Sequence, residues 1–590
     1  MVAIPTKAEY GSDVVVDLLR ALEIEYVSMN PGATFRGLHD SIVNYGGNRR
    51  PELILCCHEE IAVSLAHGYG KAAGKPMAAA VHDIVGLLHA SMAVYNAWVD
   101  RAPLLLLGAT GPMAVEKRRP WIDWIHTALV QGNVVRDYVK WDDQPTSLLG
   151  IVEAVLRGWQ LACMEPRGPV YICLDAALQE ERLNGAPPLP DLRRFDPPSP
   201  VQADPVALRR AAELLVLAER PVVIADYLGR NPKSVEALVQ LAELLALPVL
   251  DNGNLFSFPN THPLDLTGAE EELLAEADVI LSLDVFDLFQ SLTTVDRITR
   301  QAKYLIPETA KIIDLSLRHF AIRSWAQDYG RLQGVDVNIA ASTALAIPAL
   351  VEQCRAVLAR HPERQEAIQR RYRKLKDRHD ALRKMWQQEA QGQWNLRPVS
   401  MARLAAELWE VVKDEDWVLV NRDIGRANWA RRLWRWDVPY RYLGSSMGGG
   451  LGVGIGHSMG AALAHKPFER LCIDIQPDGD LLYTASGLWT AAHHRIPLLV
   501  VMLNNRSYYN DEVHQEVVAR MRGRSVENKI IGIRIDDPPV DFAQLARAFG
   551  LQAWGPIDDP EKLRPALEQA VRYVKEQRRC ALVDVVTQPM

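Results

Sequence analysis

Several features that would assign this chain to a function class are missing from its sequence. Its seven cysteines are scattered through 590 residues and do not form the short paired spacings of zinc or iron–sulfur sites. No apolar run approaches the ~18 residues that a membrane helix requires. Lys7, Glu9 and Asp13 interrupt any apolar core of an N-terminal secretory leader. We therefore predict a cytoplasmic protein that does not bind membranes.

Strong charge of one sign is also absent. Lysine and arginine together number 66 and aspartate and glutamate 73, which gives a formal net charge of −7. The most basic stretch, within residues 356–395, also contains interspersed acids. Because nucleic-acid binding needs a concentrated positive field, we do not expect a nucleic-acid partner.

Alternating strand and helix patterns fill most of the chain. Apolar runs that read as buried strands alternate with helical patterns over residues 1–185, 201–355 and 396–590. A proline-rich connector separates the first two regions, and residues 356–395 form a predicted amphipathic linker helix. This organisation predicts an α/β protein with three doubly wound parallel-sheet domains.

The most informative stretch is residues 471–510. An apolar run ends in Pro477-Asp478-Gly479, a helical segment follows, and a second apolar run ends in Asn504-Asn505. This is one strand–helix–strand unit, so the carboxyl ends of its two strands meet at one sheet edge. A carboxylate from Asp478 and an amide oxygen from Asn505 suit a hard cation such as Mg²⁺.

A second stretch places an acid where a buried strand meets a helix. Leu53 to Cys57 reads as a strand that leads directly into His58-Glu59 and the helical segment EIAVSLAHGYGKAAG. Glu59 has two interpretations: an acid that favours the helix dipole, or a partly buried acid with a raised pKa. Glu60 is expected to be solvated.

Together these stretches resemble the two cofactor motifs of thiamine diphosphate enzymes, a family that includes acetolactate synthases and benzoylformate decarboxylase. The resemblance implies that Glu59 hydrogen-bonds the aminopyrimidine ring and activates the cofactor. It implies that Asp478, Asn505 and the main-chain carbonyl of Ser507 hold Mg²⁺. Residues 1–185 would be the pyrimidine-binding domain, 201–355 the central domain and 396–590 the diphosphate-binding domain. The family's sites lie between subunits, which predicts a homodimer or homotetramer.

The resemblance extends to further cofactor contacts. Asp423 and Gly425 lie in a turn that touches the diphosphate in relatives. In the glycine run GSSMGGGLGVGIGHSMGAAL, Gly449 is part of the matching segment, and Leu451 takes the position of the residue that props the cofactor. An ordinary glycine-rich helix contact is the alternative. Gly479 and Asp480 complete the diphosphate turn, but this chain has Pro477 where glycine is usual and Asp480 where a small residue is common.

The substrate side is less specific. His82 and His262 match the two catalytic histidines of benzoylformate decarboxylase, although His82 has an alternative as a helix cap and His262 as a surface-loop residue. Ala33 stands where benzoylformate decarboxylase has a substrate-contacting serine. The segment around Gly229 has too few glycines for the loop that binding of a flavin would need. These matches predict decarboxylation of a 2-keto acid to an aldehyde. The alternatives are acetolactate-synthase-like or aldehyde-lyase carboligation and a non-catalytic protein that retains the fold.

Overall fold

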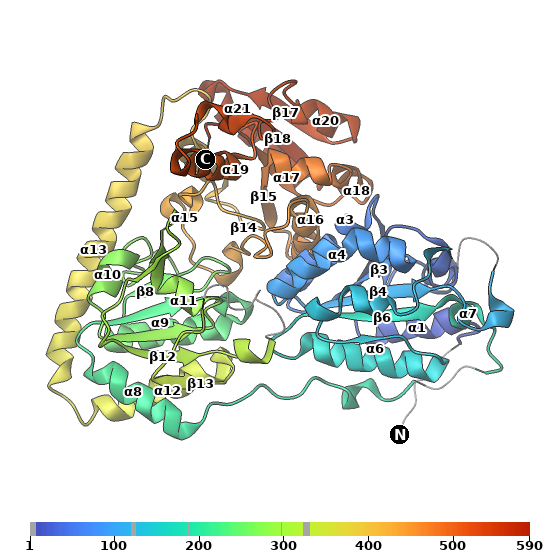
Figure 1. Cartoon of the computed structure of the whole chain (residues 1–590), viewed down its shortest axis with the longest axis horizontal. Helices are drawn as coiled ribbons and strands as arrows, with labels where there is room; N and C mark the ends of the chain where they lie inside the picture. The colour runs from blue at the N-terminus through green and yellow to red at the C-terminus, as the bar shows by residue number, and fades with distance from the viewer. Residues whose placement is uncertain (1–6, 120–124, 186–188, 297, 322–330, 590) are drawn as a thin grey trace.

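The computed structural model describes residues 7–119, 125–185, 189–296, 298–321 and 331–589 (Figure 1). Three separate parallel sheets follow one another along the chain, and helices cover both faces of each sheet. This arrangement confirms the predicted class of three doubly wound α/β domains. Among the described residues, every helix is too short or too polar to cross a bilayer.

The first domain contains a six-stranded sheet in the order β2-β1-β3-β4-β6-β5. Its strand β3 is a run of small residues whose side chains alternate between two hydrophobic cores, with Ala79 on one face and Ala78 and Ala80 on the other. Helices α3 and α4 cover the first face, and α1 and α6 cover the second. The strands are β1 (Tyr26–Met29), β2 (Glu52–Leu55), β3 (Met77–Val81), β4 (Leu104–Thr110), β5 (Asp142–Asp143) and β6 (Pro169–Asp175), and the helices are α1 (Gly11–Ala21), α3 (Glu59–Ala73), α4 (Asp83–Val99) and α6 (Leu148–Cys163).

The central domain has a five-stranded parallel sheet in the order β13-β12-β9-β7-β8, with an antiparallel hairpin, β10-β11, beside it. Helix α13 (Arg364–Gly392) then runs along the outside of the molecule toward the third domain (Figure 1). Ile368, Leu375, Leu382 and Trp386 form its buried stripe. The main elements are β7 (Pro221–Ala225), β8 (Val249–Asp251), β9 (Val279–Leu283), β10 (Thr293–Val295), β11 (Ala302–Tyr304), β12 (Lys311–Leu315), β13 (Val337–Ile339), α8 (Pro205–Leu217), α9 (Pro232–Leu245) and α12 (Thr343–Leu358).

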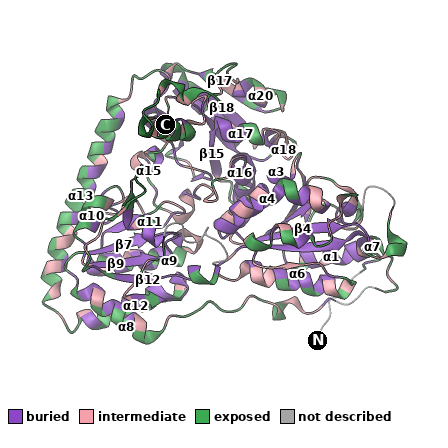
Figure 2. Ribbon diagram, in the orientation of Figure 1, coloured by how far each residue is buried: buried purple, intermediate pink, exposed green. Residues whose placement is uncertain are grey.

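The third domain has the sheet order β14-β15-β16-β18-β17, again fully parallel. Four of these strands, β14, β15, β16 and β18, are buried at every residue, and the edge strand β17 is partly exposed (Figure 2). The main elements are β14 (Trp417–Leu419), β15 (Leu471–Pro477), β16 (Leu499–Asn504), β17 (Gln552–Ile557), β18 (Ala581–Val586), α14 (Met401–Val412), α15 (Trp429–Leu433), α16 (Gly454–His465), α17 (Asp478–Tyr483), α18 (Gly487–His493), α19 (Tyr509–Met521), α20 (Phe542–Ala548) and α21 (Leu563–Gln577).

Helices α3 and α16 join the first and third domains, and glycines allow them to touch. A Cβ atom on Gly68 would lie 1.9 Å from the carbonyl oxygen of His457, and one on Gly460 would lie 1.8 Å from that of Leu65. No side chain fits at such separations, so the backbones are in direct contact. The second half of the glycine run therefore packs helices, which was one of the two interpretations of that sequence.

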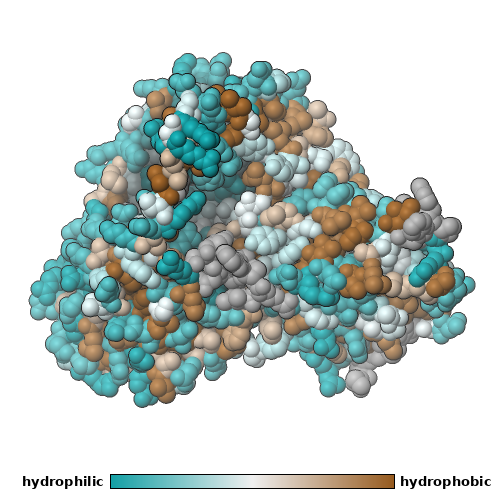
Figure 3. Space-filling view, viewed as in Figure 1, coloured by the Kyte–Doolittle hydropathy of each residue, from teal (hydrophilic) through white to brown (hydrophobic). Residues whose placement is uncertain are grey.

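Exposed apolar side chains gather on the first domain (Figure 3). Leu88 is 57% exposed and Leu129 is 82% exposed, and Val130 is also exposed. Apolar side chains that gather on one exposed face are typical of surfaces that another protein covers.

Candidate active site

The predicted metal ligands are brought together at the carboxyl edge of the third sheet. Strands β15 and β16 are neighbours, and Asp478 begins α17 directly after β15. The carboxylate of Asp478 accepts a hydrogen bond from the backbone N–H of Arg506 at 2.6 Å and another from that of Gly479 at 2.7 Å. Asn505 Oδ1 accepts a hydrogen bond from the N–H of Ser507 at 3.0 Å. Asp478 and the loop 505–507 therefore face each other directly.

The chemistry of this oxygen cluster fits a hard cation. Burial is the main cause that raises the pKa of Asp478 to about 6. A carboxylate that is buried at this cost is stabilised by a nearby positive charge. Carboxylate, amide and main-chain carbonyl oxygens are the donors that Mg²⁺ accepts. The residues present thus fit the predicted metal, with phosphate oxygens as its remaining ligands.

Asp480 is buried and directs its carboxylate at the glycine loop. It accepts hydrogen bonds from the N–H groups of Gly452 at 2.8 Å and Gly454 at 3.2 Å, and from the side-chain amide of Gln476 at 2.6 Å. The two backbone N–H groups lie at the start of α16, where the helix dipole favours negative charge. The extra carboxylate therefore orders the loop that carries Gly449 and Leu451.

The glycine loop itself remains accessible. Gly449 is exposed and has a left-handed φ of 67°, and no atom lies within 4 Å of its hypothetical Cβ. Leu451 is partly exposed in the same loop. The prop role of Leu451 and the contact at Gly449 remain predictions.

The carboxylate of Asp423 is hydrogen-bonded to backbone N–H groups of the turn and helix that follow it. Its carboxylate accepts hydrogen bonds from the N–H groups of Ile424 at 2.5 Å, Ala430 at 2.7 Å and Arg431 at 3.0 Å. Burial raises its pKa to about 6. Gly425, with φ of 68°, completes the turn. Both residues line a cavity of about 300 Å³ together with Arg422, Arg426 and Leu503, the last of these near the end of β16.

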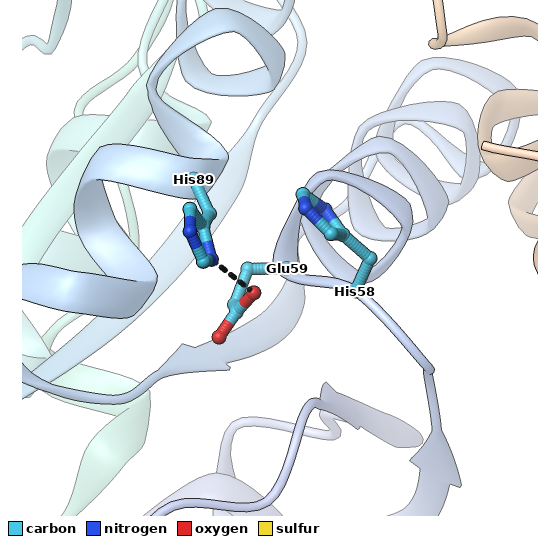
Figure 4. Close-up of side chains that lie close together, drawn as sticks. All are labelled: His58, Glu59 and His89. Atoms are coloured by element: carbon cyan, nitrogen blue, oxygen red, sulfur yellow. Dashed lines mark hydrogen bonds and ion pairs between the residues drawn. The ribbon is translucent and has the colours of Figure 1, made fainter. Parts of the chain in front are cut away.

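Glu59 is the first residue of α3 and is 6% exposed. His89, from α4, lies against it with Nδ1 3.1 Å from Glu59 Oε2 (Figure 4). A Cβ atom on Gly86 would lie 3.3 Å from the Glu59 side chain, so glycine leaves room for the carboxylate. The ring of His58 stacks on that of His89 with centroids 5.1 Å apart. One ligand atom from each of His58, Glu59 and His89 lies within 4.8 Å of the other two.

The expectation for Glu60 was wrong, because its side chain is buried rather than solvated. Its carboxylate accepts a hydrogen bond from the N–H of Ala93 at 3.2 Å. Its pKa is raised to about 8, mainly by burial and in small part by the nearby charge of Asp480, while the hydrogen bond from Ala93 opposes this shift. The carboxyl turned inward because α3 is packed on all sides between α4 and α16, a contact that sequence periodicity did not reveal.

His82 occupies the cap position of α4, but its side chain makes no capping hydrogen bond, so the capping alternative was wrong. Nδ1 instead lies 2.8 Å from Thr34 Oγ1, and Nε2 lies 3.2 Å from Nδ1 of His126. A Cβ on Gly32 would lie 2.3 Å from Cβ of His82, so the Asn30-Pro31-Gly32 turn packs directly against this histidine.

His262 lies in the loop between β8 and α10 (Glu270–Ala275) of the central domain. Its Nδ1 accepts a hydrogen bond from the N–H of Leu264 at 3.2 Å, and its Nε2 lies 3.4 Å from Glu243. These partners belong to the central domain, and the structure does not bring His262 into contact with His82 or Glu59 within the described chain. Its catalytic role remains a prediction.

The sequence did not predict three side chains that lie at the carboxyl edge of the first sheet: Thr34, His89 and His126. The seven-residue spacing of His82 and His89 was a usable signal, since such residues share one face of a helix. Thr34 and His126 had no such signal, because their segments meet His82 only in the folded sheet.

Comparisons with known proteins cover nearly the whole chain. Three protein-family models of the thiamine pyrophosphate enzymes match the chain in sequence order. The N-terminal TPP binding domain matches residues 10–131, the central domain matches 208–329, and the C-terminal TPP binding domain matches 423–585. The chain is 26% identical to the acetolactate synthase isozyme 3 large subunit of Escherichia coli, with 98% of this chain and 94% of that protein aligned.

Two further proteins extend the comparison. Benzoylformate decarboxylase of Pseudomonas aeruginosa is 25% identical, with 94% of this chain and 96% of that protein aligned. The crystal structure of benzoylformate decarboxylase from Polynucleobacter necessarius superposes with a TM-score of 0.75 at 18% identity and covers 99% of both chains. The latter similarity concerns the fold.

Proposed function

Since this chain belongs to the thiamine pyrophosphate enzyme family, we propose that it decarboxylates a 2-keto acid to an aldehyde with thiamine diphosphate and Mg²⁺. Its relatives include both decarboxylases and acetolactate synthases. The observation that carries the proposal is the pair of sheet edges. One presents the buried acid Glu59, and the other presents the oxygens of Asp478 and Asn505.

Each edge has a separate task in this proposal. Asp478, Asn505 and the carbonyl of Ser507 bind Mg²⁺, which links the protein to the diphosphate. Glu59 holds a proton against the aminopyrimidine ring in a buried site. When bound, the cofactor supplies the electron sink that allows carbon dioxide to leave a 2-keto acid. His82 holds a proton at the carboxyl edge of the first sheet.

We also propose that the site is completed between subunits of a homodimer or homotetramer. Leu88, which is 57% exposed, directly precedes the glutamate-bound His89 on α4. An apolar side chain so close to Glu59 is suited to burial by another subunit. In this arrangement the first domain of one subunit faces the third domain of its partner.

The test is release of carbon dioxide from a panel of 2-keto acids, with thiamine diphosphate and Mg²⁺ present or with the metal removed by a chelator. Cofactor- and metal-dependent release with an aldehyde as the product is expected. Binding of thiamine diphosphate is measured in parallel by calorimetry. Absence of binding with Mg²⁺ present would contradict the proposal and favour a non-catalytic protein.

Acetolactate-synthase-like carboligation is the second candidate, and Ala33 favours it. This side chain has no hydroxyl with which to contact an aryl keto acid beside the Asn30-Pro31-Gly32 turn. Product analysis with pyruvate, benzoylformate and benzaldehyde separates the candidates. Free aldehyde indicates decarboxylation, and a new hydroxyketone or acetohydroxy acid indicates carboligation.

A further inference from the structure

Beside Glu59, the carboxyl edge of the first sheet carries a row of three connected side chains. Thr34 follows β1 in the short helix η1 (Ala33–Phe35), His82 follows β3, and His126 follows β4 in the chain. His82 is in the middle, with Nδ1 2.8 Å from Thr34 Oγ1 and Nε2 3.2 Å from Nδ1 of His126. The His82 and His126 rings meet edge to face, with centroids 5.3 Å apart.

Exposure increases along this row. Thr34 is 1% exposed, the His82 side chain is 12% exposed, and His126 is partly exposed. The buried end is therefore fixed, and His126 is the end that solvent or a small molecule reaches first. Since both ring nitrogens of His82 already have neighbours, His82 cannot donate directly to a substrate without losing one of these contacts.

We propose that His126 is the terminal proton donor and acceptor of a histidine pair, in which His82 holds the proton and His126 exchanges it with the substrate or solvent. This inference rests on the proposed function only where it states that His126 exchanges a proton with the substrate. The pairing itself rests on the contacts of His82.

The proton balance of the pair can be written out. In the neutral pair, His126 Nδ1–H donates to His82 Nε2, and His82 Nδ1–H donates to Thr34 Oγ1, so His126 Nε2 is free to accept a proton. A proton taken from solvent binds His126 Nε2, and the Nδ1–H proton of His126 passes to His82 Nε2, where the pair holds it. For delivery, the Nε2–H proton of His82 returns to His126 Nδ1, and the His126 Nε2–H bond breaks as its proton passes to the reacting atom. Both rings are then neutral and in their starting tautomers.

The surroundings favour positive charge on this pair. Asp83 Oδ2 lies 3.9 Å from His82 Nδ1, and the Asp83 residue is fully buried at the start of α4. Thr127 Oγ1 lies 3.4 Å from Asp83 Oδ1 and fixes the other carboxylate oxygen. A carboxylate this close stabilises an imidazolium by Coulomb attraction. Asp83 and His126 are titratable groups that lie against the His82 ring.

Coupling within the pair gives a direct test that does not require activity. Hydrogen–deuterium exchange at the imidazole C2 carbon, followed by mass spectrometry over a pH series, reports the titration of each histidine. Two rings that share one proton titrate in two coupled steps. His126→Gln keeps a hydrogen-bonding group at this position but does not titrate, so we expect the His82 curve to become a single step with a shifted midpoint. An unchanged His82 curve in that variant would overturn the pairing.

The same variant, His126→Gln, also allows a kinetic test. His126→Gln should lower kcat by about 10²-fold, the usual scale of general acid–base catalysis, and should remove one limb of the pH–rate profile. Binding of thiamine diphosphate should not change, since His126 does not contact Glu59 or Asp478 in the structure. An unaltered pH profile, or an equal loss of cofactor binding and turnover, would show that His126 has only a structural role.

Two further variants distinguish a specific loss of the Thr34–His82–His126 contacts from a general loss of folded structure. Thr34→Val removes the hydroxyl that faces His82 Nδ1 and should lower kcat by about tenfold, whereas Thr34→Ser should restore it. His39→Gln alters an exposed histidine of the same domain, on α2 (Arg36–Asp40), and should behave as wild type. If no 2-keto acid is turned over by the wild type, the proposed function fails, but the exchange experiment still decides the pairing.

Discussion

The two sheet edges that carry the candidate site are built differently. At the third-domain edge, Asp478 and Asn505 belong to one strand–helix–strand unit, and backbone N–H groups of the same unit hold their oxygens. At the first-domain edge, Thr34, His82 and His126 come from separate segments and meet through side chains. Glu59 likewise meets His89 of another helix. The predicted metal edge, formed by Asp478 and Asn505, is therefore local in the sequence, whereas the contacts at the first-domain edge depend on the whole sheet.

This difference has an energetic side. Burial raises the pKa of Asp478 to about 6 and that of Glu60 to about 8. At the metal edge, a bound cation offsets the cost of a buried carboxylate. Glu60 is buried between α3 and α4, close enough to Asp480 of the third domain to sense its charge, and its carboxyl favours the protonated form. Four substitutions test the comparison.

The largest effect is expected for Glu59→Gln. Removing the acid should suppress exchange of the cofactor C2 proton by 10³-fold or more, about 4 kcal/mol, because the ring loses its proton partner. Thiamine diphosphate should still bind, since the metal edge is intact. Exchange is followed by proton NMR after quenching in deuterated buffer. An unchanged exchange rate would refute the role of Glu59 and the division of tasks between the edges.

Glu60→Gln tests the neighbouring buried acid. The folded-state pKa of about 8 exceeds the usual value of 4.5, so the folded protein binds more protons than the unfolded chain between these pH values. Wild-type stability should therefore fall as pH rises from about 4.5 to about 8. The variant should lack this fall and be more stable than the wild type above pH 8.

Thermal denaturation over a pH series measures the Glu60 effect. Glu116→Gln, at an exposed acid of the same domain, is the control and should follow the wild type. Parallel pH profiles for Glu60→Gln and the wild type would contradict the assigned burial.

Asp478→Asn tests the metal edge. Loss of the anionic ligand should weaken Mg²⁺-dependent binding of thiamine diphosphate by about 30-fold, or ~2 kcal/mol. Because the metal needs the ionised carboxylate, wild-type affinity should fall as pH drops through about 6, and the variant should lack this dependence. Calorimetric titration measures both effects. Asp437→Asn, at an exposed acid of the same domain, is the control, and equal weakening in both variants would argue against the site.

The smallest effect is expected for Ala33→Ser. A new hydroxyl beside the Asn30-Pro31-Gly32 turn should raise kcat/KM for benzoylformate relative to pyruvate by about fivefold, the value of one hydrogen bond of ~1 kcal/mol. Steady-state kinetics with the two acids measures the ratio. An unchanged ratio would show that Ala33 does not determine which of the two acids is preferred.

The sequence by itself determined the sheet edges at which chemistry was to be expected. Strand runs that end in Asp478, Asn505 and Glu59 predicted their placement, because side chains that follow parallel strands meet at one edge. Helix and strand periodicity was likewise enough to predict three α/β domains.

Tertiary structure alone decided what each side chain contacts. Glu60 lies inside because α16 packs against α3, Asp480 binds the glycine loop because that loop folds over α17, and His82 bonds Thr34 and His126 because three strands lie side by side. These contacts join segments far apart in the chain, and local patterns carry no information about which distant segments meet.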